Sequence, residues 1–217
     1  MINSSSESIA KFRKNYGKFQ LDESQVKANP VEQFDLWFIE SIKAGIEEPN
    51  AMFLATCGKN MQPSGRIVLL KDYSENGFDF HTNYNSRKGN EIKENPLVSA
   101  TFFWGPLERQ IRIEGEIEVL DRNYSELYFK TRPFDSRIGA WASEQSKVIP
   151  SREFLLNRFE EFSKKFKDDV PVPEHWGGLR IVPSKIEFWQ GGENRLHDRI
   201  LYTKNPDNKW EISRLSP

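Results

Sequence analysis

Apolar and polar residues alternate along much of this chain in the pattern that predicts β-strands. The clearest case is the segment RQIRIEGEIEVL, residues 109–120, in which Ile111, Ile113, Ile117 and Val119 are separated from one another by other residues, mostly polar. Because successive side chains of a strand point to opposite faces, this segment predicts one packed face and one polar face, as in an antiparallel sheet or barrel wall. Other short apolar runs predict strands at residues 51–57, 66–73, 77–83, 97–104, 178–190, 195–204 and 209–215.

A helix is predicted before the strands begin. Phe34, Phe38 and Ile42 are spaced four residues apart and predict an amphipathic helix over residues 31–46, which ends near Gly45. Such a helix would lay one apolar face on the sheet.

A second helix is predicted over residues 151–166, where Ser151 is a suitable N-cap and an apolar stripe runs from Leu155 to Phe166. A weaker helical pattern covers residues 123–133. Many short strands with a few helices predict a mainly β fold of the α+β class, built on a small closed or half-closed barrel. We expect one domain over residues 1–217, with residues 1–20 as a flexible N-terminal segment.

Composition narrows the classes of function. The chain has 217 residues, with 31 Lys and Arg against 32 Asp and Glu, so it lacks the basic excess of a general nucleic-acid or membrane-surface binder. Cys57 is its single cysteine, which excludes an intrachain disulfide, and the three histidines show no metal-ligand spacing. No secretory signal or membrane-spanning run is present, so we expect a cytoplasmic protein without a metal site.

The segment NYNSRKGNEIKENP, residues 83–96, is a candidate anion site. Asn85 or Ser86 can cap a short helix, which puts Arg87 and Lys88 in its first turn. Cations there oppose the helix dipole, unless a phosphate binds the helix N-terminus together with both side chains. The alternative is a fraying helix with solvated basic residues.

A second candidate is YFKTRPFDS, in which Tyr128, Arg132 and Ser136 are spaced four residues apart. A phenol, a guanidinium and a hydroxyl are good phosphate donors, although an amphipathic helix with polar surface residues gives the same spacing. Arg66 and Lys71 bracket four aliphatic residues and, in a regular strand, would point to opposite faces. That pair would indicate a binding site only if one phosphate lay on each face of the strand.

The third candidate is FWQGGENRLHDR, residues 188–199. If its end is extended, Arg195, His197 and Arg199 share one face. One interpretation is an edge strand with solvated charges; the other is an anion or an electron-rich ring lying over the three side chains, with His197 as a proton-transfer or hydrogen-bonding group. Trp189 and the two glycines suit a loop that approaches a flat aromatic ligand.

The segment IEFWQGGENRLHDR resembles the signature of the pyridoxamine 5′-phosphate oxidase family. RIVLLK, HTNYNSRKG, LERQIRIEG, YFKTRPFDSRIGAWASEQS, HWGG and WEISRLSP are similar to the same family and follow in the same order. The resemblance is nearly continuous from about Pro49 to Pro217 and weaker before it.

This resemblance implies an FMN-binding split β-barrel, antiparallel and Greek-key-like with peripheral helices, that forms a homodimer with FMN at the subunit interface. The residues it assigns to FMN are Arg66, Ile67, Val68, Leu69, Leu70, Lys71, His81, Thr82, Arg87, Lys88, Gln110, Gln145, Ser146, Trp189 and Arg199. Those it assigns to the substrate are Lys71, Tyr128, Arg132, Ser136, Arg195 and His197, of which Arg195 and His197 are the catalytic pair over the pyridine ring.

The chain departs from the family pattern at a few positions. His81 stands where Tyr is often found, so only its backbone role carries over. Glu48 replaces an acidic residue that is commonly Asp, and FRKNY, residues 12–16, resembles a segment that covers the substrate as a lid.

The activity implied is FMN-dependent oxidation of pyridoxamine 5′-phosphate and pyridoxine 5′-phosphate to pyridoxal 5′-phosphate, with O2 reduced to H2O2, in vitamin B6 salvage. Two alternatives remain open on the residues alone. A flavin reductase-like split barrel would bind FMN without a dedicated clamp for a substrate phosphate. A non-catalytic pyridoxal phosphate-binding module would bind no flavin and consume no oxygen.

Overall fold

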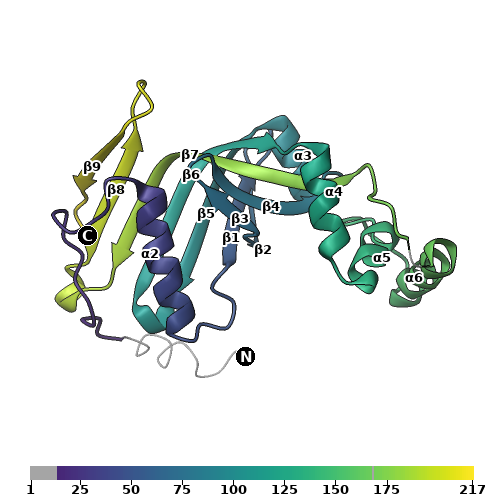
Figure 1. Ribbon diagram of the computed structural model, residues 1–217, viewed down its shortest axis with the longest axis horizontal. Helices are drawn as coiled ribbons and strands as arrows, with labels where there is room; N and C mark the ends of the chain where they lie inside the picture. The colour runs from purple at the N-terminus through teal and green to yellow at the C-terminus, as the bar shows by residue number, and fades with distance from the viewer. Residues whose placement is uncertain (1–13, 168) are drawn as a thin grey trace, which may run out of the picture. The chain divides into compact units, whose positions relative to one another are not determined.

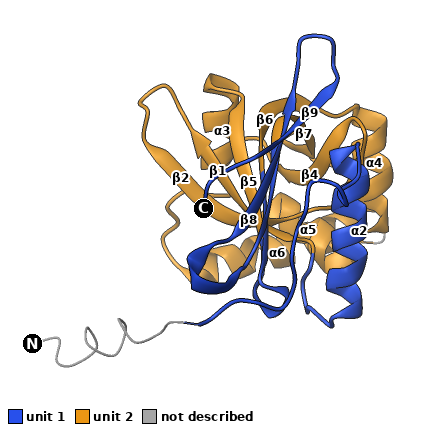
Figure 2. Ribbon diagram, turned by 90° about the vertical axis from the view of Figure 1, so that its left-hand side faces the viewer, with its two compact units in different colours: residues 1–49, 103–112, 186–217 blue, residues 50–102, 113–185 orange. Residues whose placement is uncertain are grey.

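The computed structural model describes residues 14–167 and 169–217, and the chain divides into two compact units (Figure 2). Unit 1 comprises residues 1–49, 103–112 and 186–217, and unit 2 comprises residues 50–102 and 113–185. The expectation of a single domain stays a prediction. Of the N-terminal segment expected to be flexible, residues 1–13 lie outside the described part of the chain, and residues 14–20 form no helix or strand.

Unit 2 is built on an antiparallel sheet whose strand order is β2-β1-β5-β6-β7-β4-β3 (Figure 1). Its strands are β1 (Ala51–Cys57), β2 (Pro63–Leu69), β3 (Asp72–Ser74), β4 (Gly77–Asn83), β5 (Leu97–Trp104), β6 (Arg109–Val119) and β7 (Trp176–Gln190). The last part of β5, the first part of β6 and the end of β7 belong to unit 1. Most of these strands lie close to the predicted ranges, which confirms the mainly β, antiparallel expectation. The single strand predicted at residues 66–73 is wrong, because β2 ends at Leu69 and β3 begins at Asp72.

Alternation of side chains explains how the sheet of unit 2 packs. Met52 and Leu54 on β1 are fully buried, whereas Phe53 between them is 47% exposed. On β4, Phe78 and Phe80 are fully buried, and His81 lies opposite Gly178 of β7. The apolar positions of the pattern thus form a core on one face of the sheet.

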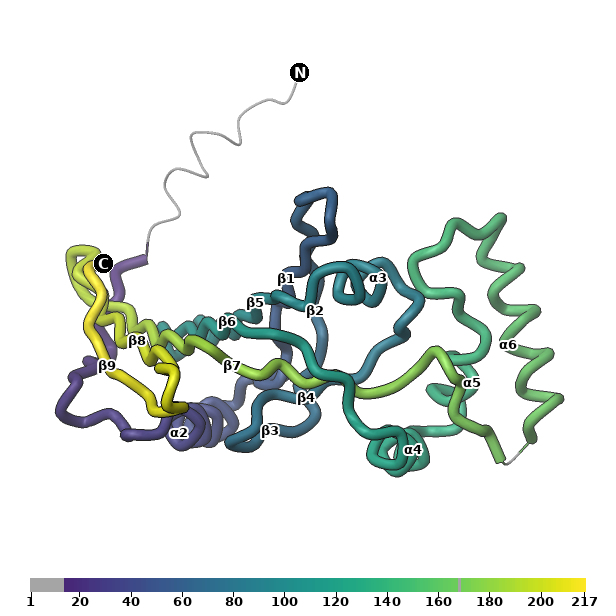
Figure 3. Tube along the Cα trace, turned by 90° about the horizontal axis from the view of Figure 1, so that it is seen from above, coloured from purple at the N-terminus to yellow at the C-terminus, as the bar shows by residue number. Residues whose placement is uncertain are grey.

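The helices of unit 2 are α3 (Arg87–Glu94), α4 (Arg122–Thr131), α5 (Phe134–Ala142) and α6 (Arg152–Phe166). Ser151 caps α6 as predicted, because its side chain accepts a hydrogen bond from the backbone N–H of Phe154. α5 and α6 lie side by side (Figure 3), and the apolar stripe of α6 packs on a small cluster around Phe129 and Trp176. No described helix is both long and apolar enough to cross a bilayer.

Unit 1 contains α2 (Pro30–Lys43), β8 (Asp198–Lys204) and β9 (Trp210–Arg214), together with two short 3-10 turns at Gly105–Leu107 and Glu193–Arg195. β8 pairs with β7 and with β9. The ring of Trp37 on α2 meets the edge of Phe188 on β7 at 5.2 Å, which fixes the helix on the strand.

Two expected packing positions are wrong in detail. Ile42 is 54% exposed, because α2 instead turns Phe34, Trp37 and Ser41 inward. Val119 is 70% exposed, so the packed face of β6 does not extend to the end of that strand. An apolar side chain exposed to this extent is available for contact with a second subunit.

Candidate active site

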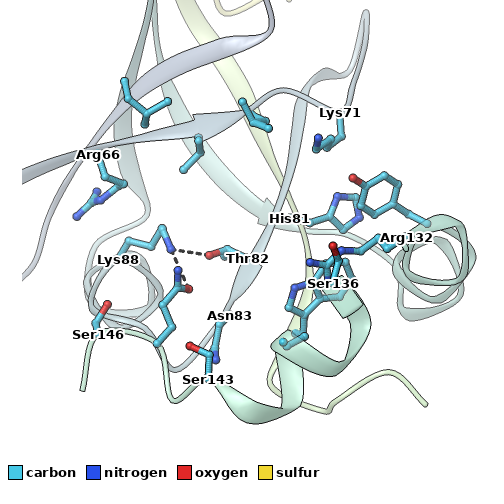
Figure 4. A pocket seen from close by; sticks show the side chains of 18 of the residues that line it. Arg66, Lys71, His81, Thr82, Asn83, Lys88, Arg132, Ser136, Ser143 and Ser146 are labelled. Carbon is cyan, nitrogen blue, oxygen red and sulfur yellow. Dashed lines mark hydrogen bonds between the residues drawn. The ribbon is translucent and has the colours of Figure 1, made fainter. Parts of the chain in front are cut away.

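Unit 2 contains a cavity of about 1070 Å³, shown in Figure 4. Its walls come from β2, β4, the first turn of α3, the end of α4 and α5 with the segment that follows it. Its basic lining residues are Arg66, Lys71, Arg87, Lys88 and Arg132, and among the described residues that line it there is no Asp or Glu. A concave surface with one sign of charge concentrates anions.

Lys88 lies at one end of this cavity and is the most buried of its cations, with 7% of its surface exposed. Its Nζ donates to the Thr82 hydroxyl at 2.7 Å and to the Gln145 side-chain oxygen at 3.2 Å. No carboxylate among the described residues pairs with it. Burial, and then the charge of Arg66, lower the pKa of Lys88 to about 8. A buried cation that has only neutral partners favours an incoming anion.

The residues on either side of Lys88 place it at this end of the cavity. Ser86 is the N-cap of α3 and accepts a hydrogen bond from the N–H of Gly89, as the sequence predicted. Gly89 is required by packing, because a Cβ at this position would lie 2.2 Å from the carbonyl oxygen of Tyr84. The N-terminus of α3 therefore sits tightly on the chain before it and directs Lys88 inward.

Arg66 lies at the same end of the cavity and is held by side chains of unit 2. Its Nη1 donates to the Thr56 hydroxyl at 2.6 Å, and its Nη2 lies 3.4 Å from Glu91. Glu91 also pairs with Arg87 at 2.8 Å. Burial raises the pKa of Glu91, but hydrogen bonds from Ser64, Thr56 and Arg87 outweigh this and lower the pKa to about 2. One carboxylate thus orients two arginines, and neither the pairing nor Glu91 was part of the sequence prediction.

The other end of the cavity gathers Lys71, Arg132 and Ser136 (Figure 4). Pro133 separates α4 from α5, so Tyr128 and Arg132 come from the end of one helix and Ser136 from the start of the next. Nη1 of Arg132 is buried without a hydrogen-bond partner among the described residues. Its guanidinium lies over the ring of Trp176 at 4.9 Å. A buried guanidinium donor that has no protein partner is suited to binding a phosphate oxygen.

His81 lies next to this second group. Its ring stacks on Tyr128 at 4.1 Å and on Trp176 at 5.1 Å. Burial, then the charges of Arg132 and Lys71, lower the pKa of His81 to about 4. The ring is therefore neutral at physiological pH.

The residues of the segment 188–199 belong to unit 1. The prediction that Arg195, His197 and Arg199 share one face of a strand is wrong, because β8 begins only at Asp198 and Arg195 ends a short 3-10 turn with φ of 64°. The glycine-rich turn before it explains this: the N–H of Gly192 donates to Nδ1 of His197 at 3.1 Å, which folds the loop back on itself. The ring of Trp189 packs on that of His197 at 4.7 Å.

The segment before α2 reaches the same loop. Tyr16 meets the edges of Trp189 at 5.7 Å and of His197 at 6.0 Å. The N–H groups of Gly17 and Lys18 donate to the buried carboxylate of Glu108 at 2.9 and 3.1 Å. The lid role expected of FRKNY stays a prediction, and its residues 12–13 lie outside the described chain. Glu48 is exposed in unit 1, and its role also stays a prediction.

The cavity brings together most of the residues assigned by resemblance. Those that line it are Arg66, Ile67, Val68, Leu69, Lys71, His81, Thr82, Arg87, Lys88, Tyr128, Arg132, Ser136, Gln145 and Ser146. Leu70 is buried and does not line it. Gln110, Trp189, Arg195, His197 and Arg199 are in unit 1. Arg66 and Lys71 do not share a regular strand, since β2 ends at Leu69.

Sequence reasoning missed several supporting residues. Glu91 could have been found from its i, i+4 spacing to Arg87. Trp176 was quoted only as part of HWGG, although it is the platform for Arg132 and His81. Glu187, which pairs with Arg199, carried no local signal.

Two family models match this chain. Residues 38–166 match the family model described as pyridoxamine 5′-phosphate oxidase. Residues 176–217 match the model described as pyridoxine 5′-phosphate oxidase C-terminal dimerisation region. Together these two matches cover most of both units.

Curated relatives match almost end to end. A protein of Trichormus variabilis (strain ATCC 29413 / PCC 7937) is 53% identical over 210 residues, which cover 96% of this chain and 98% of the relative. A protein of Paraburkholderia xenovorans (strain LB400) is 53% identical over 211 residues, covering 97% and 99%. Both are named pyridoxine/pyridoxamine 5′-phosphate oxidase.

Solved structures share the fold. PhzG from Burkholderia lata 383, in complex with tetrahydrophenazine-1-carboxylic acid, has a TM-score of 0.88 at 27% identity, over 93% of this chain and 100% of that one. A pyridoxamine 5′-phosphate oxidase-related, FMN-binding protein from Nostoc punctiforme PCC 73102 has a TM-score of 0.69 at 15% identity, over 87% and 97%. The predicted split-barrel fold is confirmed, and on its family matches and its relatives the chain belongs to the pyridoxamine 5′-phosphate oxidase family.

Proposed function

We propose that this protein oxidises pyridoxamine 5′-phosphate and pyridoxine 5′-phosphate to pyridoxal 5′-phosphate, with FMN as its cofactor and O2 as the electron acceptor. The observation that carries the proposal is the cavity of unit 2, which has a cationic group at each end and no acidic lining residue among those described. Two phosphate-bearing molecules, a cofactor and a substrate, match such a site. The names of relatives that are 53% identical over nearly the whole chain support the same reaction.

The residues at the Lys88 end fit the phosphate of FMN. Lys88 is a buried cation whose partners are neutral, and Arg66 and Arg87 are oriented toward this end by Glu91. The capped N-terminus of α3 adds backbone dipoles of the right sign. FMN held there would supply a hydride acceptor that O2 can reoxidise.

The residues at the Arg132 end fit the phosphate of the substrate. Lys71, Tyr128, Arg132 and Ser136 would hold it from four directions, and the unpartnered Nη1 of Arg132 would gain an acceptor. Because the phosphate is remote from the reacting carbon, this binding energy orients the pyridine ring rather than joining in the chemistry.

Arg195 and His197 are the proposed catalytic pair over the pyridine ring. Nδ1 of His197 accepts the N–H of Gly192, so a neutral His197 carries its proton on Nε2 and presents a donor to the substrate. Arg195 would stabilise electron density on the ring or on its substituent. The rings of Trp189 and Tyr16 pack against that of His197.

The reaction balances with O2 as the oxidant and, for the amine, with water. Pyridoxine 5′-phosphate loses one hydride and one proton, and O2 becomes H2O2. Pyridoxamine 5′-phosphate additionally takes up water and releases ammonia. Selection for the amine or for the alcohol would then depend on groups close to the exocyclic carbon, far from the phosphate.

The proposed working form is a homodimer with FMN at the subunit interface, where Gln110, Trp189 and Arg199 would complete the flavin contacts. Two observations support a dimer. The C-terminal residues match a dimerisation region. The uncovered side chains of Phe53, Ile67, Leu97 and Val119 are apolar and lie on strands of one sheet, as at the centre of a subunit contact. A cytoplasmic location stays a prediction.

The test begins with the visible spectrum of the purified protein. Pyridoxine 5′-phosphate is added without oxygen, and the flavin bands should bleach, then return on admitting air as pyridoxal 5′-phosphate forms. Flavin bands that respond to neither vitamer phosphate would instead indicate a flavin reductase-like relative with another substrate. A colourless protein that FMN does not reconstitute would contradict the flavoenzyme proposal and favour a pyridoxal phosphate-binding module.

A further inference from the structure

His81 is a titratable side chain to which the proposed reaction gives no task. It lies on β4 opposite Gly178 of β7, and its ring is nearly parallel to those of Tyr128 and Trp176, at 21° and 17°. A Cβ on Gly178 would lie 3.1 Å from Nε2 of His81, so the absence of a side chain there makes room for the ring. The imidazole is therefore held firmly in one place.

The two nitrogens of this ring are buried and have no hydrogen-bond partner among the described residues. A neutral imidazole tolerates this better than an imidazolium, whose two N–H donors would both be unsatisfied. Burial alone thus keeps a proton off the ring while the site holds no ligand.

The two cations near His81 act in the same direction as burial. Lys71 comes from the turn after β2 and Arg132 from the end of α4, and both oppose a positive charge on the ring. The other neighbours from α4 are the phenols of Tyr124 and Tyr128, and β7 contributes the uncharged Trp176 and Gly178. The carboxylate of Asp72 is hydrogen-bonded to the hydroxyl of Tyr124 at 3.0 Å, not to the imidazole.

A phosphate dianion beside Lys71 and Arg132 would cancel this field. Its two negative charges offset the two cations that oppose protonation, and an anion close to an imidazole favours the charged form. We propose that His81 takes up a proton when the phosphate group of the substrate binds beside Lys71 and Arg132. This inference rests on the proposed function for its ligand and adds a proton-linked, phosphate-sensing residue to that site.

Two consequences follow from linkage. Because phosphate binding favours the protonated ring, a protonated ring must favour phosphate binding by the same free energy. Affinity for an anion that keeps both charges, such as sulfate, therefore rises as the pH falls toward the titration midpoint of His81 in the filled site, and an uncharged vitamer shows no such rise. The site then carries its third positive charge only when filled, which spares the empty site a mutual repulsion.

The chain suits a direct test by NMR, because it has only three histidines, His81, His175 and His197. The FMN-loaded protein, in which the Lys88 end is already occupied, is titrated from about pH 8 to about pH 4 with and without sodium sulfate. Sulfate keeps both charges over this range, whereas a phosphate ester titrates near pH 6. His81→Phe identifies the His81 signal by its loss.

We expect sulfate to raise the titration midpoint of His81 by about one pH unit or more, and to leave His175 unchanged. His175 is the internal control, since its Nε2 lies 3.2 Å from the carbonyl oxygen of Ala140 and its partner does not titrate. Lys71→Met should raise the midpoint without sulfate and reduce the effect of sulfate. Calorimetry at about pH 5, close to these midpoints, in two buffers of different ionisation enthalpy should give proton uptake on sulfate binding that is absent in His81→Phe.

A His81 midpoint that sulfate leaves in place, or no binding of sulfate by calorimetry, overturns the inference. Oxidation of pyridoxine 5′-phosphate is measured on the same samples to separate the two proposals. Active enzyme with a fixed His81 midpoint contradicts the proton uptake alone. Inactive protein with a sulfate-dependent midpoint contradicts the proposed reaction and leaves the proton-linked anion site standing.

Discussion

Glu187 holds Arg199 through two parallel hydrogen bonds, from Nε to Oε1 at 2.8 Å and from Nη2 to Oε2 at 3.1 Å. Arg112 approaches the same carboxylate at 3.1 Å, so one buried negative charge lies between two arginines of neighbouring strands. The hydrogen bonds to Glu187 raise the pKa of Arg199. Arg199 is thus oriented before any ligand arrives, and it keeps N–H donors for one.

Glu187→Gln should therefore weaken both the fold and the cofactor site. Losing the carboxylate leaves two arginines facing each other, and we expect the free energy of unfolding to fall by about 1–3 kcal/mol. Because Arg199 is no longer oriented, the dissociation constant of FMN should rise. Urea unfolding and fluorescence titration measure the two effects. Glu211→Gln, at an exposed position on β9, is the control and should change neither.

Lys88→Met should separate stability from cofactor binding. We expect the FMN dissociation constant to rise about 10- to 100-fold, the loss of one charge-assisted hydrogen bond. The apoprotein should unfold at a higher temperature, because a buried cation without a carboxylate partner is removed. Thermal unfolding with and without FMN tests both. Lys93→Met, at an exposed position of the same helix, should leave both quantities unchanged.

With Lys88 present, the stability of the folded apoprotein should depend on pH. The pKa of Lys88 is lowered from 10.5 to about 8 in the folded apoprotein. As the pH falls through this range the unfolded chain binds the proton first, so the folded state loses stability, and the loss is complete below about pH 8. Lys88→Met should flatten this part of the stability curve. An unchanged slope in the variant would contradict the buried-cation account.

Arg132→Gln should discriminate between phosphorylated and unphosphorylated substrates. Arg132 is proposed to bind the substrate phosphate through a donor that has no partner among the described residues, and we expect KM for pyridoxine 5′-phosphate to rise about 10- to 100-fold. The weak turnover of pyridoxine itself should hardly change. Lys130→Gln, at an exposed position near the end of α4, serves as the control. Equal loss with both substrates would mean that Arg132 is structural.

Gly89→Ala tests the close packing at the start of α3. The added methyl group would lie 2.2 Å from the carbonyl oxygen of Tyr84, so the first turn must shift and Lys88 with it. We expect a loss of about 1–3 kcal/mol in the free energy of unfolding and weaker binding of FMN. Gly139→Ala in α5 is the control for stability, because a Cβ there meets nothing within 4 Å. That change should be neutral or slightly stabilising.

Acid should weaken the fold through His81. Its folded pKa is lowered from 6.5 to about 4, so above pH 6.5 the ring is neutral in both states and the folded protein loses nothing. As the pH falls from 6.5 to about 4 the unfolded chain binds a proton that the folded chain does not, and stability declines. In His81→Phe, urea unfolding at pH 7 and pH 5 should show a smaller decline. A decline as steep in His81→Phe as in the parent would contradict this account.

Period-two patterns located the strands well because burial of one face is a local, repeated property of the sequence. The limits of β1 and β4 match the predicted ranges, and Ser151 and Ser86 cap the helices that they were expected to begin. Ile42 was wrongly predicted to be buried, because the residue spacing of this helix is compatible with two overlapping buried faces, one with Phe38 and Ile42 and one with Trp37. The larger ring of Trp37, packed on Phe188, decides between them, and that contact is distant in sequence.

The candidate site was predicted unevenly for a similar reason. Tyr128, Arg132 and Ser136 were singled out by their four-residue spacing and do line one cavity, although Pro133 ends α4 and puts Ser136 on the next helix. Periodicity also placed Arg195 and His197 in a strand, but the hydrogen bond from Gly192 makes a turn there that alternation does not reveal. The assignment of each cation to one end of the cavity needed three-dimensional contacts, such as the shared partner Glu91.

His81 and Thr82 are consecutive residues of β4, yet one stacks beside Arg132 and the other hydrogen-bonds Lys88. A single peptide unit of a paired strand therefore sets the spacing between the two ends of the cavity. Strands hold such spacings more rigidly than loops do. The distance between the two ends is thus built into the strand: a one-residue deletion in β4 should disturb both ends together, and changes in the surrounding loops should not restore them.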